Sequence, residues 1–181
     1  GILFVNNDDE LLLKLSERCK KIKYGIKKNT EIKIIDNTPF LKIKWGNSII
    51  NSRLIGDYQV YNISLAICIG NYFNISNTNI KIAIESYIPE NNRSQIKETK
   101  DNFIIMDAYN ANPSSMKEMI KSFSQQKFKN KICILGDMLE MGDYSKKEHL
   151  NIIQLCKKLN LETIFLRKEF KELNNENFKK L

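Results

Sequence analysis

The second half of the chain alternates short, continuously apolar segments with longer amphipathic ones, and this order constrains the fold more than any other feature. The apolar segments are Phe103–Met106, Ile132–Leu135 and 162–166. Helical patterns separate them, one beginning at Asn112-Pro113, an N-cap residue followed by proline, and one over 146–159. Continuous apolar strands joined by helices are typical of a parallel sheet covered by helices. The sequence therefore predicts an α/β fold with a Rossmann-like parallel sheet and helices on both faces.

The first half of the chain reads as a separate mixture of strands and helices. A short strand over 2–6 is followed by a helix through Leu11 and Cys19, and further strands are predicted over 22–26, 31–35 and 40–45. Helical spacing then covers 60–73 and 78–87, and the second helix stops before Pro89. The pattern changes after this proline, so we predict one domain over 1–89 and a second over 90–181.

The charge distribution and the lengths of the apolar runs indicate which partners the chain can have. The chain has 29 Lys and Arg against 21 Asp and Glu, a formal charge of +8. The lysines are spread along the whole chain, whereas a nucleic-acid surface needs them clustered on one face. We therefore predict no nucleic-acid partner, and keep a basic nucleic-acid-binding module as an alternative. The apolar runs are much shorter than the roughly 20 residues of a membrane helix, so we expect no membrane partner either.

The cysteines and the single histidine give no sign of a metal site. Four cysteines lie far apart without a CxxC pair, and His149 is the only histidine. We predict no bound metal in this chain and buried, reduced thiols, as in a cytoplasmic protein. His149 is predicted to be a core or surface residue rather than a catalytic one.

Polar residues follow two of the predicted strands. Asp107 opens a loop that also carries Tyr109, Asn110 and Asn112, and this loop leads into a helix N-terminus, which favours anions. Asp137 follows the next strand. Carboxyl ends of parallel strands meet at one edge of a sheet, so we expect Asp107 and Asp137 to be neighbours there. Asn112 is also predicted to cap the helix, and Ser145 with Glu148 to form a capping box at the start of the following helix.

Phosphate-binding loops of the common kinds are missing from these 181 residues. Neither GxxxxGK[ST] nor GxGxxG occurs. If the protein uses ATP, backbone N–H groups of such a loop must come from elsewhere.

Several segments in a fixed order resemble the Mur ligase family. They are DAYNANPSSM at 107–116, ILGDMLEMG at 134–142 followed by His149, PENNRSQ at 89–95, LIGDYQVYN at 54–62 and VNNDD at 5–9. The resemblance covers nearly the whole chain. Within the family, the DAYNANP loop is similar to that of the branch that adds D-Ala-D-Ala. One position departs from the family pattern, because Gln59 stands where Asn is usual.

This resemblance implies an activity, a location and a place within a longer protein. Such a ligase would join D-Ala-D-Ala to UDP-N-acetylmuramoyl-tripeptide through an acyl phosphate, using ATP and Mg²⁺, and would be a cytoplasmic monomer. Residues 1–89 would be the end of the central ATPase domain, and 90–181 a truncated C-terminal domain. Since the P-loop domain would precede them, we expect the 181 residues alone to be inactive and to contain no catalytic residue.

The resemblance also assigns roles to six residues. ATP would be bound by Asn62 at the adenine, Arg93 at the phosphates and Asp107 at the ribose hydroxyls. Tyr109, Asn110 and Asn112 would face the dipeptide or the nucleotide. These roles suit the side chains, since guanidinium groups fork onto phosphate and carboxylates accept from hydroxyls. A folylpolyglutamate-synthase-like ligase remains the alternative enzyme, and the DAYNANP loop argues against it.

Overall fold

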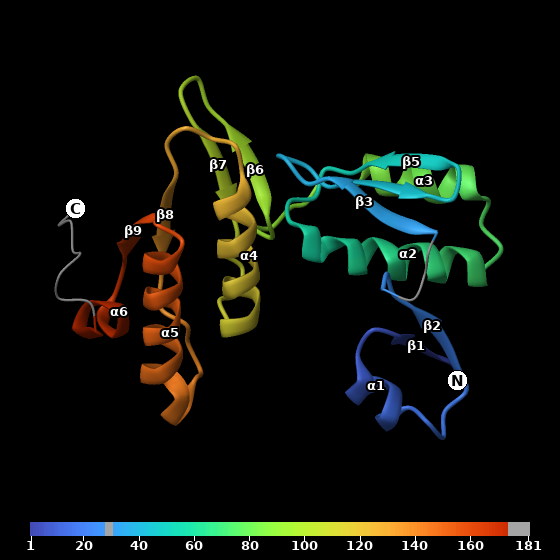
Figure 1. The fold of residues 1–181 in the computed structure, drawn as a ribbon, viewed down its shortest axis with the longest axis horizontal. Coiled ribbons are helices and arrows are strands. Elements are labelled where there is room, and N and C mark those ends of the chain that lie inside the picture. The colour runs from blue at the N-terminus through green and yellow to red at the C-terminus, as the bar shows by residue number, and fades with distance from the viewer. Residues whose placement is uncertain (28–30, 174–181) are drawn as a thin grey trace. The chain divides into compact units, whose positions relative to one another are not determined.

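A computed structural model of the chain describes residues 1–27 and 31–173. The chain divides into two compact units, Gly1–Pro89 and Glu90–Leu181 (Figure 1). None of the helices in this part of the chain combines the length and the apolar composition that a membrane span requires. Each unit has its own hydrophobic core.

The first unit contains a parallel pair of strands and an antiparallel sheet. Strand β1 (Leu3–Asn6) runs parallel to β2 (Lys21–Tyr24), and α1 (Glu10–Leu15) connects them. Strands β3 (Ile32–Asp36), β4 (Lys42–Trp45) and β5 (Ser48–Asn51) form an antiparallel sheet in that order. The tight turn at Gly46, whose φ is +54°, closes the β4–β5 hairpin.

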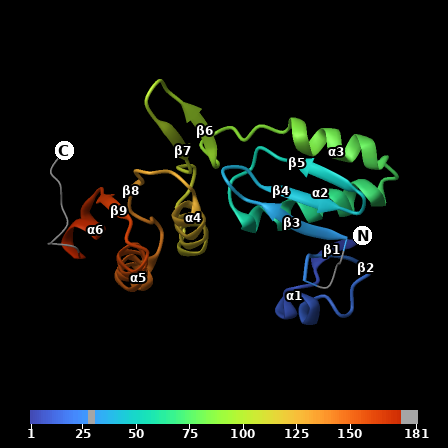
Figure 2. The same ribbon diagram turned by 45° about the horizontal axis from the view of Figure 1, so that its top comes forward.

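Two helices complete the first unit. A single 3₁₀ turn, η1 (Asp57–Gln59), leads into α2 (Val60–Tyr72), and α3 (Asn77–Ser86) follows. Figure 2 shows α2 and α3 beside the three-stranded sheet. Apolar residues of β4, β5 and α2 form the centre of this core, among them Ile43, Ile50 and Ile63. Burial of this apolar surface is what holds the helices to the sheet.

The second unit consists of two two-stranded sheets and their helices. Strand β6 (Gln95–Glu98) pairs antiparallel with β7 (Phe103–Met106), and β8 (Ile132–Leu135) pairs parallel with β9 (Glu162–Phe165). The helices are α4 (Pro113–Gln125), α5 (Ser145–Lys158) and α6 (Lys168–Leu173), with a 3₁₀ turn η2 (Gly142–Tyr144) before α5. Both views show α4 and α5 side by side (Figures 1 and 2).

The α/β class predicted from the sequence is confirmed, and the strand arrangement differs from the prediction in its details. The pairing partner of β7 is β6, a segment that the sequence did not indicate as a strand, and β7 and β8 belong to different two-stranded sheets. On β8, Cys133 is buried, whereas Ile132 and Ile134 are 49% and 62% exposed. Because side chains alternate along a strand, the described helices bury one face of this sheet rather than both.

The cysteines are less uniformly buried than predicted. Cys133 and Cys156 are buried, and Cys68 is half-buried. Cys19 is exposed and lies beyond the end of α1 at Leu15. Burial raises the pKa of the Cys133 thiol to about 12. All four thiols are free.

Candidate functional site

The segments before β6 and after β7 are hydrogen-bonded to each other. These hydrogen bonds bring together two residues that are predicted to bind ATP, Arg93 and Asp107. We call residues Asn92 to Tyr109 the 92–109 hairpin. Beyond the strand ends, the backbone N–H of Ala108 donates to the carbonyl of Asn92 at 2.8 Å. Asp107 Oδ1 accepts from the backbone N–H of Ser94 at 2.9 Å and from the Ser94 hydroxyl at 3.3 Å. The hairpin therefore places Arg93 and Asp107 on adjacent strand extensions.

One carboxylate oxygen of Asp107 is hydrogen-bonded within the protein, while the residue as a whole is exposed to solvent. Ser94 is buried and has a φ of +51°, a backbone conformation that non-glycine residues seldom adopt. The carboxylate of Asp107 holds this strained turn in place. Both hydrogen bonds use Oδ1, and no hydrogen bond to Oδ2 is found within residues 1–27 and 31–173. The residue itself is exposed, so one oxygen can accept from a ligand.

Arg93 and Tyr109 form a cation–π contact. The guanidinium carbon of Arg93 lies 3.9 Å from the centre of the Tyr109 ring, well within the roughly 6 Å range of this interaction. Both residues are exposed, and Tyr109 retains 62% of its accessible surface. The contact therefore lies on the surface of the unit and not in its core.

Asn112 caps helix α4, as the sequence predicted. Its Oδ1 accepts from the backbone N–H of Ser115 at 3.0 Å, and its backbone is extended with Pro113 at the first helical position. Capping occupies this oxygen and leaves the amide nitrogen. Asn110 is exposed on the same loop.

Asn62 lies in the first unit, on the first turn of α2. Its amide nitrogen donates to Gln59 Oε1 at 2.7 Å. Gln59, which departs from the family pattern, thus orients the predicted adenine ligand through an i, i+3 contact. The structure thus brings Arg93, Asp107 and Tyr109 together in the second unit, whereas Asn62 belongs to the first.

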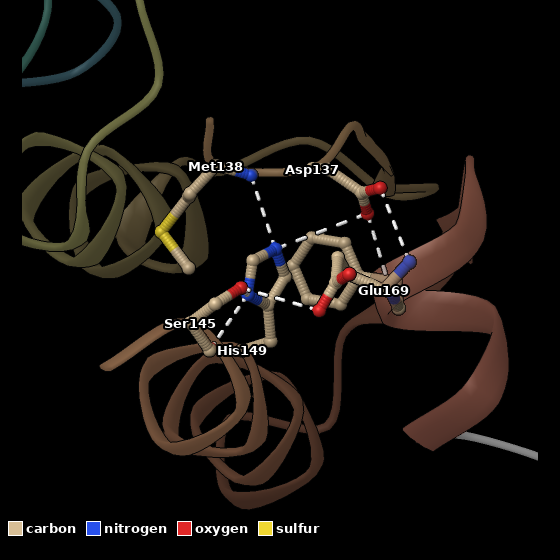
Figure 3. A network of polar contacts seen from close by, with 6 residues as sticks. Asp137, Met138, Ser145, His149 and Glu169 are labelled. Atoms are coloured by element: carbon tan, nitrogen blue, oxygen red, sulfur yellow. Dashed lines mark hydrogen bonds and ion pairs between the residues drawn. The ribbon is translucent and has the colours of Figure 1, made fainter. Parts of the chain in front are cut away.

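The second acidic segment, after β8, forms a buried network around His149 (Figure 3). We call Asp137, Met138, Ser145, His149, Glu169 and Phe170 the Asp137–His149 network. His149 is fully buried. Its Nε2 accepts from the backbone N–H of Met138 at 3.0 Å, and its Nδ1 lies 2.8 Å from the Ser145 carbonyl oxygen. A carbonyl can only accept, so the proton is on Nδ1 and the ring is neutral in this arrangement.

Asp137 serves as the acceptor for the start of α6. Its Oδ2 accepts from the backbone N–H of Glu169 at 3.1 Å, and its Oδ1 from that of Phe170 at 3.2 Å. The same Oδ1 is 3.8 Å from His149 Nε2. The Phe170 ring packs edge-on against His149 with 4.5 Å between ring centres. The network therefore connects the loop after β8, helix α5 and helix α6.

The predicted capping box at Ser145 and Glu148 is wrong. Helix α5 begins at Ser145 itself, and no side chain caps it. The Ser145 hydroxyl donates to Glu169 Oε2 at 3.2 Å, and Glu148 is paired with Lys117 of α4 at 2.8 Å. The hydrogen bond from Lys117 lowers the pKa of the Glu148 carboxyl. Tertiary partners have replaced the local pairing that the sequence suggested.

The Asp137–His149 network has the residue types of a catalytic triad without the geometry. The Ser145 hydroxyl lies 3.3 Å from His149 Nδ1, but this nitrogen already donates to the Ser145 carbonyl, and the hydroxyl donates to Glu169. His149 also has no exposed surface. A nucleophile needs a base that takes its proton and a route for the substrate. His149 is therefore a core residue, one of the two positions, core or surface, that the sequence predicted for it.

A third acidic residue, Asp8, joins the ends of β1 and β2. Its Oδ2 accepts from the backbone N–H groups of Ile26 and Lys27 at 2.7 and 2.9 Å. A side chain at Gly25 would lie 2.9 Å from the same oxygen, so glycine is needed there. Burial raises the pKa of the nearby Tyr61 phenol, and the Asp8 carboxylate raises it further.

Sequence reasoning missed Ser94, Gln59 and Glu169 as contact residues. Gln59 and Asn62 are three positions apart at the start of a helix, and this spacing could have indicated their contact. Ser94 and Glu169 contact Asp107 and Ser145 across long sequence separations, for which the sequence carries no local signal. Among the residues that the structure describes, no group of three or more His, Cys, Asp or Glu side chains is arranged to hold a metal ion.

Comparison with known proteins agrees with this fold and with the motifs. Residues 92–180 match the family model described as "Mur ligase, glutamate ligase domain", and residues 1–70 match the "Mur ligase middle domain". The two matches cover each of the two units in turn. The chain belongs to the Mur ligase family.

Individual relatives are similar at the level of a distant homologue. The UDP-N-acetylmuramoyl-tripeptide–D-alanyl-D-alanine ligase of Bacillus subtilis is 31% identical over 149 residues, which cover 78% of this chain and 32% of that protein. The ligase of the same name from Buchnera aphidicola is 31% identical over 176 residues, covering 91% and 38%. The chain thus spans about a third of the length of these curated relatives.

Among solved structures, the fold is similar to that of a MurF ligase from Thermotoga maritima in complex with ADP. The TM-score is 0.79 at 20% identity, with 98% of this chain and 43% of that chain covered. At this identity the comparison supports the fold and no finer property.

Proposed function

We propose that this chain is a segment of an ATP-dependent ligase of peptidoglycan precursor synthesis, which joins D-Ala-D-Ala to UDP-N-acetylmuramoyl-tripeptide. The names of the two relatives support the reaction. Residues 1–89 would form the end of the central ATPase domain and 90–181 part of the C-terminal domain. The proposal includes a cytoplasmic, monomeric protein whose partners are these small-molecule substrates.

The observation that carries the proposal is the 92–109 hairpin. It holds an exposed guanidinium and an exposed carboxylate on adjacent strand extensions, and the carboxylate of Asp107 fixes the turn that contains Arg93. A nucleotide offers complementary groups, with anionic phosphates for Arg93 and ribose hydroxyls for Asp107. The donor set of the hairpin therefore fits this ligand chemically.

In the proposed reaction, the tripeptide carboxylate attacks the γ-phosphate of ATP, the bond to the β–γ bridging oxygen breaks, and an acyl phosphate forms as ADP leaves. The amine of D-Ala-D-Ala then attacks the acyl carbon, and inorganic phosphate leaves through a tetrahedral intermediate. Arg93 would offset negative charge on the phosphates, and Asn62, oriented by Gln59, would contact the adenine. Asn110 and the amide nitrogen of Asn112 would face the dipeptide or the nucleotide. The family resemblance assigns Mg²⁺ to the preceding part of the full-length ligases.

Substitution of Asp107 tests the proposal in a full-length ligase that carries this segment. A carboxylate that accepts from ribose hydroxyls contributes roughly 1.5–3 kcal/mol, so Asp107→Ala is expected to raise the KM for ATP about 10- to 150-fold. The KM for D-Ala-D-Ala should change much less. An unchanged KM for ATP would show that Asp107 does not bind the nucleotide.

The isolated 181-residue chain provides a second test. We expect no release of phosphate from ATP, because the chain carries no GxxxxGK[ST] sequence. Hydrolysis by the pure chain above the rate in buffer would contradict the proposed division of the site.

A further inference from the structure

The Arg93–Tyr109 contact has a feature that the fold does not explain. Tyr109 is 62% exposed and lies outside the core cluster of its unit. Burial therefore does not account for the position of this ring. The one aromatic or cationic contact found for it within the described residues is the stacked guanidinium of Arg93.

The backbone around Arg93 is fixed, but its side chain needs a further support. Asn91, Asn92 and Ser94 all have φ values near +55°, and Asp107 binds Ser94. These constraints define where the Cα atom of Arg93 lies. They leave the flexible side-chain torsions free, and ordering a long side chain costs conformational entropy.

A ring beneath the guanidinium plane can supply this missing constraint. Stacking engages the face of the planar group and leaves its N–H edges available for hydrogen bonds in the plane. A phosphate ligand would approach those edges. The aromatic ring, rather than the hydroxyl, provides the stacking surface.

We infer that Tyr109 is a positioning residue that holds the Arg93 guanidinium ready for the phosphates, and not a direct ligand of the dipeptide or nucleotide. The inference rests on the phosphate role of Arg93 in the proposed function. It changes the role that the sequence predicted for Tyr109, from substrate binding to the orientation of a neighbouring ligand.

Three single variants in a full-length ligase test the role of the ring. Tyr109→Leu is expected to raise the KM for ATP about two- to fivefold, the size of an exposed cation–π contact. Tyr109→Phe restores the ring and should recover the wild-type KM. Tyr144→Leu is the matched control, since Tyr144 is a similarly exposed tyrosine, at 69%, at the end of the 3₁₀ turn η2, and this variant should leave the KM unchanged. A raised KM in Tyr109→Phe would point to the hydroxyl and would overturn the inference.

A double-mutant cycle separates positioning from direct contact. If Tyr109 acts through Arg93, Tyr109→Leu should have no further effect on the KM for ATP in an Arg93→Ala background. If the two effects multiply, Tyr109 contacts the substrate directly and the inference is wrong. If Arg93→Ala alone leaves the KM unchanged, the phosphate role of Arg93 fails and the inference fails with it. A raised KM in Arg93→Ala with none in Tyr109→Leu overturns the inference alone.

The contact itself can be measured in this chain without any substrate. The Nε–H resonance of Arg93 should shift upfield because it lies over an aromatic ring, and the shift should persist in Tyr109→Phe. In Tyr109→Leu it should move to the position of a solvated arginine. An Arg93 resonance that is the same with and without the ring would overturn the inference, whatever the kinetics show.

Discussion

Asp107 and Asp137 hold comparable places in the sequence and very different places in the structure. Each follows an apolar strand of the second unit by one or two residues. Asp107 is exposed and has one carboxylate oxygen engaged with Ser94. The side chain of Asp137 is only 6% exposed, and both of its oxygens accept from the start of α6. A similar sequence pattern has produced an open carboxylate in one loop and a buried structural acceptor in the other.

The difference comes from elements that are distant in the sequence. Helix α6 covers Asp137, and its Phe170 packs on His149 and stacks on Phe165 at 4.8 Å between ring centres. In the 92–109 hairpin, Asp107 accepts from Ser94, which lies in the turn just before β6. An acidic residue just beyond a strand therefore indicates a candidate site. Whether a ligand can reach the carboxylate depends on whether another element of the chain covers it.

The largest effect should follow removal of the buried histidine. His149→Ala leaves a cavity in the core and an unpaired backbone N–H at Met138. We expect a loss of roughly 3–5 kcal/mol in the free energy of unfolding of the second unit, measured by urea denaturation. Tyr144→Ala, at an exposed position, should cost less than about 0.5 kcal/mol. A loss for His149→Ala as small as that of this control would mean that the Asp137–His149 network does not support the fold.

A smaller effect on stability is expected at Asn112, which caps helix α4. Asn112→Ala removes the acceptor for the Ser115 N–H and should cost about 1 kcal/mol, whereas Asn112→Ser should recover most of the loss. Thermal melts of the two variants measure this difference. If Asn112→Ala changes the KM for D-Ala-D-Ala in the full-length ligase and Asn112→Ser does not, the cap and not the amide nitrogen positions the loop.

The smallest effect is expected at the buried Cys133 thiol of β8. Its folded-state pKa is raised to about 12, so raising the pH from 7 to 9 should generate almost no thiolate there. A maleimide reagent should modify the exposed Cys19 and leave Cys133 unmodified in the native protein, as mass spectrometry of peptides would show. Rapid labelling of Cys133 at pH 9 would contradict the buried position of this side chain. In His149→Ala, Cys133 labelling should increase.

Much of the fold was predictable because its strongest elements carry local signals. The apolar periodicity of 60–73 and the Asn-Pro pair before α4 correctly indicated α2 and the start of α4. Strand β6 was missed because Gln95–Glu98 contains a single apolar residue, and its pairing with β7 gives it its structure. The capping box failed because the Ser145 and Glu148 side chains found partners on other helices.

The sequence indicated which residues belong to the candidate site but not how their side chains contact each other. Asp107, Arg93 and Asn112 were identified from their positions and the family resemblance, and the cap at Asn112 is confirmed. The stacking of Arg93 on Tyr109 depends on two strand extensions that meet only in the folded unit, so no sequence spacing could indicate it. The family resemblance assigned a ligand role to Asp107 and none to Asp137, but the positions of the two residues after a strand did not indicate that the Asp137 side chain would be buried.

The most direct test of the difference between an open ligand-binding carboxylate and a buried structural one makes the same substitution at Asp107 and at Asp137, each in a full-length ligase. Asp107→Ala is expected to raise the KM for ATP about 10- to 150-fold and to cost only about 0.5–1.5 kcal/mol of stability. Asp137→Ala should cost about 2–3 kcal/mol, because two backbone N–H groups of α6 lose their acceptor. Its folded fraction should keep the KM for ATP within about twofold of wild type. Loss of stability at Asp107 with unchanged ATP affinity, or a large rise in KM at Asp137 with an intact melt, would contradict the account.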